Sequence, residues 1–406
     1  MNLPAPVLTA ISKLEASGFE AYAVGGCVRD SILGTEPLDW DITTSALPEE
    51  VSEIFRDFKV IPTGIKHGTV TVIISSMHLE ITTYRIDGKY EDNRHPVQVT
   101  FSRNITEDLS RRDFTINAMA YNPQTGFFDP FRGLDDLNRK IIKAVGIPEK
   151  RFSEDALRIM RALRFAAVLG FEIEEKTADA VFQCRTLLKN IAAERIGTEL
   201  NKILLSPAPD LIFEKYFSVF SERLFGIPSF PDKQKIDFSP LSRTTSDLAP
   251  RLAVFIICFA KALNSSPVDF SERFFSNMRY DNQTYRETAN TIKNLDIVFS
   301  DNRIFLRHII KEKGLTTVRN LINVQKAFNK SDFCSTEITL EKIIFEQDCC
   351  NLRNLAVNGT DLTNGFSLQG EEIGKALVLL LDAVIENKCE NKKDALLEYF
   401  KNKLLH

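Results

Sequence analysis

The chain has 406 residues, of which 44% are hydrophobic and 26% are charged, and its formal net charge is −4. This length predicts two to four sub-domains rather than one core, with the composition of an ordinary globular protein. The slightly acidic balance excludes a protein that coats nucleic acid by bulk attraction, so a nucleic-acid partner must be argued from local sites.

The N-terminal sequence and the cysteines indicate the cellular compartment and whether a structural metal is expected. No basic segment followed by an apolar run occurs at the start, and no stretch has the length that a bilayer requires, so we expect a cytoplasmic protein. Seven cysteines without a C-x-x-C pair, with only five histidines, predict reduced thiols and no structural zinc.

The first third of the chain predicts a mixed α/β unit. Its hydrophobic periodicity and β-branched residues predict a helix over 7–16, strands over 21–24 and 38–43, a helix starting at 29–33, and a hairpin of 70–74 and 79–84. From about residue 151 helical periodicities follow with almost no strand signal, and breaks fall near 206–209, 227–231 and Gly314.

The most informative block joins Gly25 and Gly26 to Asp39 and Asp41. Carboxylates at i and i+2 of a strand share one face and can clamp divalent metal ions, while a Gly-Gly turn leaves bare N–H groups where a phosphate can approach. The pattern therefore indicates nucleotidyl transfer, although an isolated D-x-D pair more often marks a solvated strand end. Glu80 alternates with apolar residues in its strand, and is either a third metal ligand or an exposed strand glutamate.

A second block, 111–118, places two guanidinium groups beside Asp113 and Asn117. Arginine forks match phosphate oxygens, and the carboxylate and amide suit a ribose hydroxyl. The alternative is a helix N-terminus with a charged first turn.

A third block, 154–165, predicts one amphipathic helix with Glu154, Asp155, Arg158 and Arg161 together on one face. A fixed Asp/Arg pair presents an acceptor and several donors, which suits the Watson–Crick edges of cytosine and adenine. The alternative is a ladder of surface ion pairs. Between the predicted hairpin and the block at 111–118, the charged and turn-rich segment 87–96 predicts a surface loop.

In this order the blocks resemble the motifs of class II tRNA nucleotidyltransferases, the branch of the polymerase-β-like family that adds CCA to tRNA 3′ ends. The matching segments lie within residues 20–200 and are 25–44, 111–117, 129–137, 154–164 and 194–200. The resemblance implies an α+β protein, with a mixed β-sheet head flanked by helices and an all-α remainder. It divides the chain into a nucleotidyltransferase head (1–148), a nucleotide-reading neck (149–205), a helical body (206–313) and a tRNA-binding tail (314–406).

The resemblance also implies residue roles. Asp39 and Asp41 would bind two Mg²⁺ ions with Glu80 assisting catalysis. The triphosphate would lie near Gly25, Gly26, Arg29 and Arg112, and the ribose near Asp113 and Asn117. Asp155 and Arg158 would pair with the base of CTP or ATP with Glu154 holding the arginine, and Arg161 on the same predicted face completes the candidates for base recognition. The flexible loop of CCA-adding enzymes would include Asp87, Tyr90, Asp92 and Arg94.

We therefore expect template-independent CCA addition from CTP and ATP with release of pyrophosphate. The rivals are an A-adding enzyme, a bacterial poly(A) polymerase and a catalytically inactive RNA-binding protein of the same fold. In the tail, residues 359–362 predict a helix start capped by Thr360 or Asp361, and Lys392, Lys393, Lys401 and Lys403 are candidates for contacts with tRNA phosphates, although a solvated helix face is the commoner use of such lysines. The oligomeric state is open.

Overall fold

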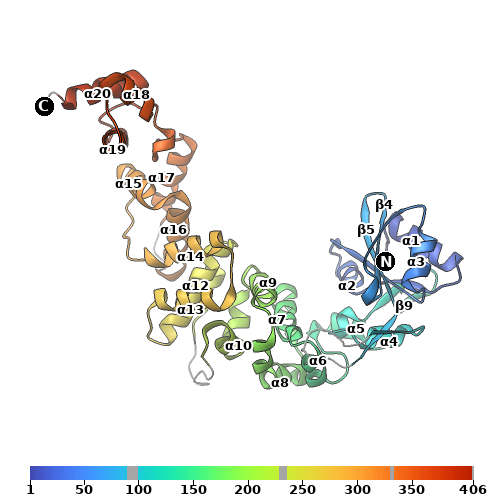
Figure 1. Ribbon diagram of the computed structural model, residues 1–406. Coiled ribbons are helices and arrows are strands. Elements are labelled where there is room, and N and C mark those ends of the chain that lie inside the picture. The colour runs from blue at the N-terminus through green and yellow to red at the C-terminus, as the bar shows by residue number, and fades with distance from the viewer. Residues whose placement is uncertain (89–98, 228–235, 330–332, 405–406) are drawn as a thin grey trace. The chain divides into compact units, whose positions relative to one another are not determined.

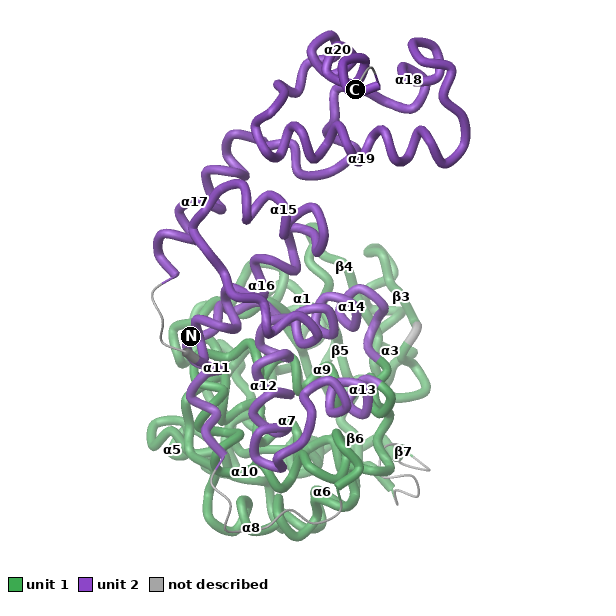
Figure 2. The backbone as a smooth tube through the Cα atoms, turned by 90° about the vertical axis from the view of Figure 1, so that its left-hand side faces the viewer, with its two compact units in different colours: residues 1–234, 276–279 green, residues 235–275, 280–406 purple. Residues whose placement is uncertain are grey.

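A computed structural model describes residues 1–88, 99–227, 236–329 and 333–404. The chain forms two compact units, residues 1–234 with 276–279 and residues 235–275 with 280–406 (Figure 2). The four-part division at 148, 205 and 313 stays a prediction.

The first unit is built on a seven-stranded mixed sheet with the order β3-β4-β5-β2-β1-β8-β9, drawn in blue and cyan in Figure 1. Together with the helices that pack against it, this sheet confirms the α+β expectation. Its strands are β1 (Ala21–Val24), β2 (Trp40–Thr44), β3 (Lys59–Gly64), β4 (Thr69–Ile74), β5 (Met77–Thr83), β8 (Ala120–Asn122) and β9 (Gly126–Phe128).

The predicted hairpin is confirmed as β4 and β5. Ser75 and Ser76 form its two-residue turn, and both have positive φ, 48° and 66°, as a tight turn between right-twisted strands requires. Strand β5 also pairs in parallel with β2, where Asp41 lies directly beside Glu80. The strand pairing therefore confirms the prediction that Glu80 lies on the same side of the sheet as Asp41.

Helices α1 (Ala5–Ala16) and α3 (Pro48–Ile54) pack against this sheet through buried apolar residues such as Val7, Leu14 and Val51. Helix α2 (Gly26–Ile32) starts directly after Gly25, three residues earlier than predicted, because Gly25 supplies a turn with φ of 81°. A short two-stranded sheet joins β6 (Arg85–Asp87) to β7 (Val99–Phe101), and the unit also contains the short helices α4 (Ile105–Ser110) and α5 (Gly133–Asn138).

The prediction of one helix across residues 154–165 is wrong. Helix α6 (Pro148–Glu154) ends at Asp155, which is extended with φ of −134° and ψ of 103°, and α7 (Leu157–Leu169) starts two residues later. A carboxylate oxygen of Asp155 accepts the backbone N–H of Leu157 at 3.0 Å, so this side chain competes with helix continuation.

The rest of the first unit is helical apart from one short strand that the sequence did not predict. β11 (Glu172–Ile173) pairs in parallel with β10 (Ile141–Ile142), so strand structure does recur after residue 151. The remaining helices are α8 (Glu175–Gln183), α9 (Ala193–Leu204) and α10 (Pro209–Phe225), and the break between the last two falls at the predicted Pro-rich segment.

The second unit is helical throughout its described residues. Gly314 separates two of its helices as predicted, but the predicted cap near residue 360 is wrong, since Asn358 is the N-cap and Asp361 makes the reciprocal bond of a capping box. The helices are α11 (Pro240–Arg243), α12 (Leu248–Ala262), α13 (Pro267–Met278), α14 (Asn282–Lys293), α15 (Arg303–Lys313), α16 (Leu315–Asn329), α17 (Cys334–Phe345), α18 (Gly359–Phe366), α19 (Glu371–Ile385) and α20 (Lys393–Leu404).

Within the described residues no single helix is long and apolar enough to cross a bilayer. Taken together, α12 and α13 reach that length and composition, but they meet at a bend of 118°.

Candidate active site

The candidate metal-binding carboxylates gather where β2 and β5 run side by side. Asp41 lies on β2 next to Glu80 on β5, and Asp39 precedes β2 in an exposed bend. Burial raises the pKa of Asp41, and the negative charges of Glu80 and Asp39 raise it further, whereas the guanidinium of Arg112 lowers it. Such crowding of oxygen donors fits a hard divalent cation, although no group of three or more His, Cys, Asp or Glu side chains among the described residues already has metal-ligand geometry.

The turn at Gly25 follows β1, which pairs with β2, the strand that carries Asp41. Its φ of 81° and ψ of −128° belong to a region that only glycine adopts readily, and a Cβ there would lie 2.9 Å from Nη1 of Arg112. The arginine therefore occupies the space that a larger residue at position 25 would fill. Gly26 opens α2, and its own added Cβ would meet Nη2 of Arg29 only at 3.8 Å.

The side chains of Arg29 and Asn117 are hydrogen-bonded to each other. Nη1 of Arg29 donates to the side-chain oxygen of Asn117 at 2.7 Å, and Nε donates to Asp30 at 2.8 Å. A candidate for the triphosphate and a candidate for the ribose, 88 residues apart in sequence, therefore hold each other in place.

Both carboxylate oxygens of Asp113 are already hydrogen-bonded to protein groups, so neither is free for a ribose hydroxyl. Its Oδ2 accepts from Nε of Arg161 at 2.7 Å, and its Oδ1 accepts from the amide nitrogen of Asn117 at 3.1 Å and from the N–H of Phe114. Burial alone would raise the pKa of Asp113, but Arg161 and these hydrogen bonds outweigh it and lower the pKa to about 2. Asp113 is thus a fixed carboxylate that aligns the amide of Asn117.

The block at 111–118 does not begin a helix, so the alternative interpretation of a charged first turn is wrong. Arg111 is the C-cap of α4, and Arg112 to Phe114 connect it to a short 3₁₀ turn at Thr115–Asn117. The two arginines therefore extend from the end of a helix rather than from its start.

Arg158 is clamped from several sides. Its Nη1 donates to Glu154 at 3.0 Å and its Nη2 donates to the backbone oxygen of Arg111 at 2.8 Å, and the residue is only 9% exposed. Glu154 also pairs with Arg151 at 2.8 Å. The sequence prediction that Glu154 lies against this arginine is therefore matched by the geometry.

The four candidates for base recognition do not share one helix face, contrary to the prediction. Arg158 pairs with Glu154, Arg161 reaches Asp113, and Asp155 accepts from Nη2 of Arg195 at 3.1 Å. The break between α6 and α7 causes this separation, because it turns Asp155 away from the helical repeat. Asp155 still precedes Arg158 by one short turn, so an acceptor and a donor lie close together in the chain.

Phe165 on α7 lies at the centre of three guanidinium groups. The central guanidinium carbons (Cζ) of Arg164, Arg29 and Arg161 lie 3.9, 5.0 and 5.4 Å from the centre of its ring. Cations attract the face of an aromatic ring, and Phe165 is buried, so these contacts tie the head helix α2 to α7.

The carboxylate of Asp108 was not among the predicted site residues. It lies on α4 with no exposed surface and contacts Arg111, Arg112 and Thr43. A single acidic residue in a charged helix gives no sequence signal for burial, although its position three and four residues before two arginines was a usable hint.

The predicted flexible loop is described only at its start. Asp87 belongs to β6, and its buried side chain pairs with Arg85 at 3.2 Å and with Arg111 at 3.8 Å, so it is a strand residue rather than part of a surface loop. Tyr90, Asp92 and Arg94 lie outside the described residues.

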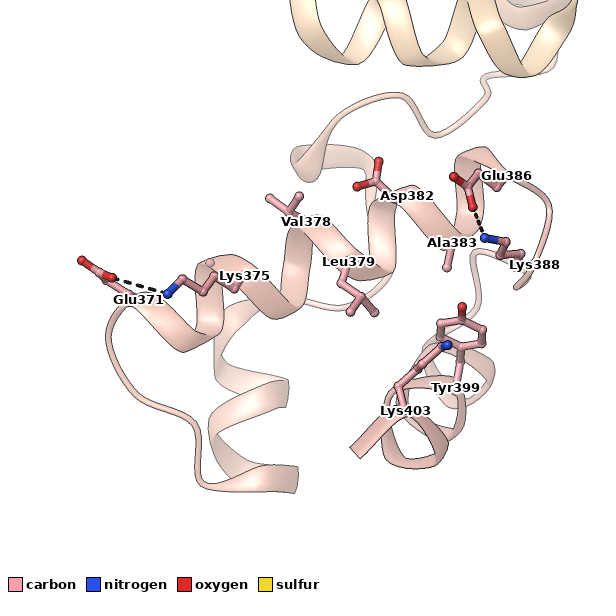
Figure 3. A pocket seen from close by; sticks show the side chains of 11 residues that line it. Glu371, Lys375, Val378, Leu379, Asp382, Ala383, Glu386, Lys388, Tyr399 and Lys403 are labelled. Carbon is pink, nitrogen blue, oxygen red and sulfur yellow. Dashed lines mark ion pairs between the residues drawn. The ribbon is translucent and has the colours of Figure 1, made fainter. Parts of the chain in front are cut away.

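The tail lysines have unequal surroundings. Lys392 pairs with Glu390 at 2.7 Å, and Lys393 pairs with Asp361. Lys403, in contrast, lines a groove of about 820 Å³ together with Tyr399 on α20 and Leu379 on α19 (Figure 3). A cation beside an aromatic and an aliphatic side chain is a surface that can contact both phosphates and bases.

Three family models match successive segments of the chain. A family model described as "Poly A polymerase head domain" matches residues 21–143, one described as "Probable RNA and SrmB- binding site of polymerase A" matches 170–218, and a model of tRNA nucleotidyltransferase domain 2 matches 255–400.

Known relatives match the chain over nearly its whole length. The CCA-adding enzyme of Lactobacillus helveticus is 36% identical over 401 residues, which are 97% of this chain and 96% of that protein. The structure of the Bacillus stearothermophilus CCA-adding enzyme in complex with CTP is 31% identical with a TM-score of 0.81, covering 99% and 98% of the two chains.

A more distant structure, the Thermotoga maritima CCA-adding enzyme complexed with tRNA, shares the fold at 21% identity, with a TM-score of 0.65 and coverage of 98% and 94%. Because the similarity above 30% identity extends from one end of the chain to the other, this chain belongs to the CCA-adding enzyme family of tRNA nucleotidyltransferases.

Proposed function

We propose that this chain adds cytidine, cytidine and adenosine in turn to the 3′ end of tRNA, using CTP and ATP and releasing pyrophosphate. The observation that carries the proposal is the clamped Arg158, whose partners Glu154 and the carbonyl oxygens of Arg111 and Arg151 fix a planar set of donors one turn from the acceptor Asp155. The end-to-end similarity to CCA-adding enzymes supports it.

Base selection follows from hydrogen-bonding chemistry. Cytosine and adenine each present an amino donor next to a ring-nitrogen acceptor, whereas uracil and guanine present a carbonyl acceptor next to an N–H donor. Asp155 would accept from the amino group and Arg158 would donate to the ring nitrogen. The same pair accepts both correct bases and rejects both wrong ones.

The head residues would bind the rest of the nucleotide. Arg112 lies next to Gly25 and Arg29 next to Gly26, and both would neutralise triphosphate oxygens, while Asn117, aligned by Asp113, would donate to a ribose hydroxyl. These contacts are the same for CTP and ATP, so they would give affinity without choosing between the two.

Asp39 and Asp41 would hold two Mg²⁺ ions, with Glu80 beside them on β5. When bound, the ions would activate the primer 3′-hydroxyl and neutralise the charge that develops on the phosphates. The hydroxyl attacks the α-phosphorus, a P–O bond to the primer forms, and the bond to pyrophosphate breaks.

The tail would hold the tRNA. The groove with Lys403 and Tyr399 on α20 offers a cation and an aromatic ring for this purpose, in the part of the chain that the tRNA nucleotidyltransferase domain 2 model matches. Because the residues that we propose to bind the nucleotide all belong to the first unit, the tail would contribute affinity for RNA rather than selectivity for the base.

The test supplies CTP or ATP alone to tRNA acceptors that end in no C, one C or CC. We expect CTP to extend the first two acceptors and ATP to extend the third by a single A, with Mg²⁺ required and Asp41→Ala inactive. Extension only of the CC acceptor would indicate an A-adding enzyme, growth beyond one A would indicate a poly(A) polymerase, and RNA binding without incorporation would indicate an inactive module.

A further inference from the structure

Asp108 is a fully buried carboxylate at which several parts of the head meet. It lies in the short helix α4, and its side chain has no exposed surface. Its Oδ1 accepts from Nε and Nη2 of Arg111 at 3.0 and 2.8 Å and from the backbone N–H of Arg85 at 3.4 Å. A buried charge persists only where such partners replace its hydration.

The second oxygen of Asp108 contacts strand β2 and Arg112. Oδ2 accepts from the hydroxyl of Thr43 at 3.2 Å and from Nη2 of Arg112 at 3.5 Å. Thr43 lies on β2 two residues beyond Asp41, so the strand that carries the candidate metal ligand also fixes this oxygen. The carboxylate is thereby held between the metal strand and the arginine.

The guanidinium of Arg112 has two different neighbours at its two ends. Within the described part of the chain, Asp108 is the one acidic side chain that forms an ion pair with Arg112. The other end of the same guanidinium, Nη1, lies 2.9 Å from where a Cβ of Gly25 would be. One edge of the guanidinium is thus anchored by Asp108 while the other lies at the glycine turn where a phosphate can approach.

We propose that Asp108 is a positioning residue that fixes Arg112 for the triphosphate of every incoming nucleotide, and so sets nucleotide affinity without choosing the base. Arg111 donates two hydrogen bonds to Oδ1 of Asp108 and neutralises most of its negative charge. Arg112 is therefore oriented by Asp108 but keeps most of its own positive charge for the triphosphate. This inference rests on the proposed assignment of Arg112 to the triphosphate.

The test measures KM and kcat separately for C addition and A addition in Asp108→Asn, a variant that keeps the shape and removes the charge. Because hydrogen bonds to charged groups contribute more than neutral ones, we expect KM for CTP and for ATP to rise about tenfold, with the CTP/ATP ratio changed less than about twofold. Glu53→Gln makes the same acid-to-amide change on α3, in an exposed ion pair with Arg56, and is the control that should leave both KM values unchanged.

A double-mutant cycle with Arg112→Ala separates positioning from a general structural effect. If Asp108 acts through Arg112, adding Asp108→Asn to Arg112→Ala should raise KM no further. Additive effects on KM, an unchanged KM in Asp108→Asn, or a changed preference between CTP and UTP would each overturn the inference.

Folding is followed by circular dichroism and thermal unfolding, because Asp108 is buried. If Asp108→Asn does not fold, Thr43→Val takes its place in the same cycle, since it removes the hydroxyl bond to Oδ2 and otherwise only a 3.3 Å bond from that hydroxyl to the backbone oxygen of Thr82. We then expect about a threefold rise in both KM values that disappears in the Arg112→Ala background, and an unchanged KM in folded Thr43→Val would overturn the inference. An unchanged KM in Arg112→Ala alone would instead refute the proposed triphosphate role of Arg112.

Discussion

Replacing Gly25 by alanine should damage both the stability of the head and its affinity for nucleotides. An L-residue at φ of 81° and ψ of −128° is strained whatever space surrounds it, and such a conformation costs about 1–3 kcal/mol. The new Cβ would also lie 2.9 Å from Nη1 of Arg112, so this guanidinium has to move.

The size of the functional effect follows from the contacts that Arg112 would lose. A charge-assisted hydrogen bond contributes about 1.5–3 kcal/mol, which corresponds to roughly a tenfold to 150-fold loss of affinity. We expect KM for CTP and ATP to rise within that range and by similar factors. The free energy of unfolding in urea and steady-state kinetics measure the two effects separately.

Two other glycines provide controls. Gly18 also has positive φ, 86°, but an added Cβ would meet nothing within 4 Å, so Gly18→Ala should lose stability and leave KM unchanged. Gly26 has no such backbone requirement, and Gly26→Ala should not destabilise the free protein. If Gly25→Ala raises KM no more than Gly18→Ala does, the contact between Gly25 and Arg112 has no role in nucleotide binding and the reasoning fails.

Three further predictions concern the base site, the Asp113 pair and the tail. Glu154→Gln should weaken the clamp on Arg158 and lower the ratio of kcat/KM for CTP over UTP by about tenfold, while Glu53→Gln leaves it unchanged; an unaltered ratio would contradict the clamp. The folded-state pKa of Asp113, about 2, lies below its ordinary 3.8, so the carboxylate contributes about 2 kcal/mol above pH 4 that is lost as the pH falls towards 2. The difference in unfolding free energy between wild type and Asp113→Asn should therefore shrink over that window, and a difference that is constant with pH would disprove the ion pair's contribution. Lys403→Ala should weaken tRNA binding and reduce its salt dependence without changing KM for CTP, whereas Lys392→Ala, which removes a lysine already paired with Glu390, should change tRNA binding less; equal effects would refute the groove's role.

The sequence was most informative where local chemistry repeats along the chain. Alternation in 79–84 placed Glu80 on the side of the aspartates, and the pairing of Asp41 with Glu80 confirms that placement because strand periodicity is strict. The glycine turn could also be predicted, because few residues other than glycine start a helix directly from positive φ.

Sequence reasoning failed where a side chain interrupted a periodic pattern or where partners lay far apart. The apolar repeat continues across residue 155, so it concealed the break, although an aspartate two residues before Leu157 is itself a helix-start signal. The pairing of Asp113 with Arg161, 48 residues apart, and the contacts of Asp108 with Thr43 and Arg85 arise from tertiary packing that no spacing in the chain encodes.

The ring of Phe165 has a consequence for how the enzyme can move during a cycle of three additions. Arg29 comes from the head, whereas Arg161 and Arg164 come from α7, and all three guanidinium groups lie against this one buried ring. Sliding the head over α7 would pull at least one cation away from the ring and break the Arg161–Asp113 pair at the same time. The residues proposed to bind phosphate and to read the base should therefore keep one fixed spacing through both C additions and the A addition, and the growing 3′ end has to move relative to them.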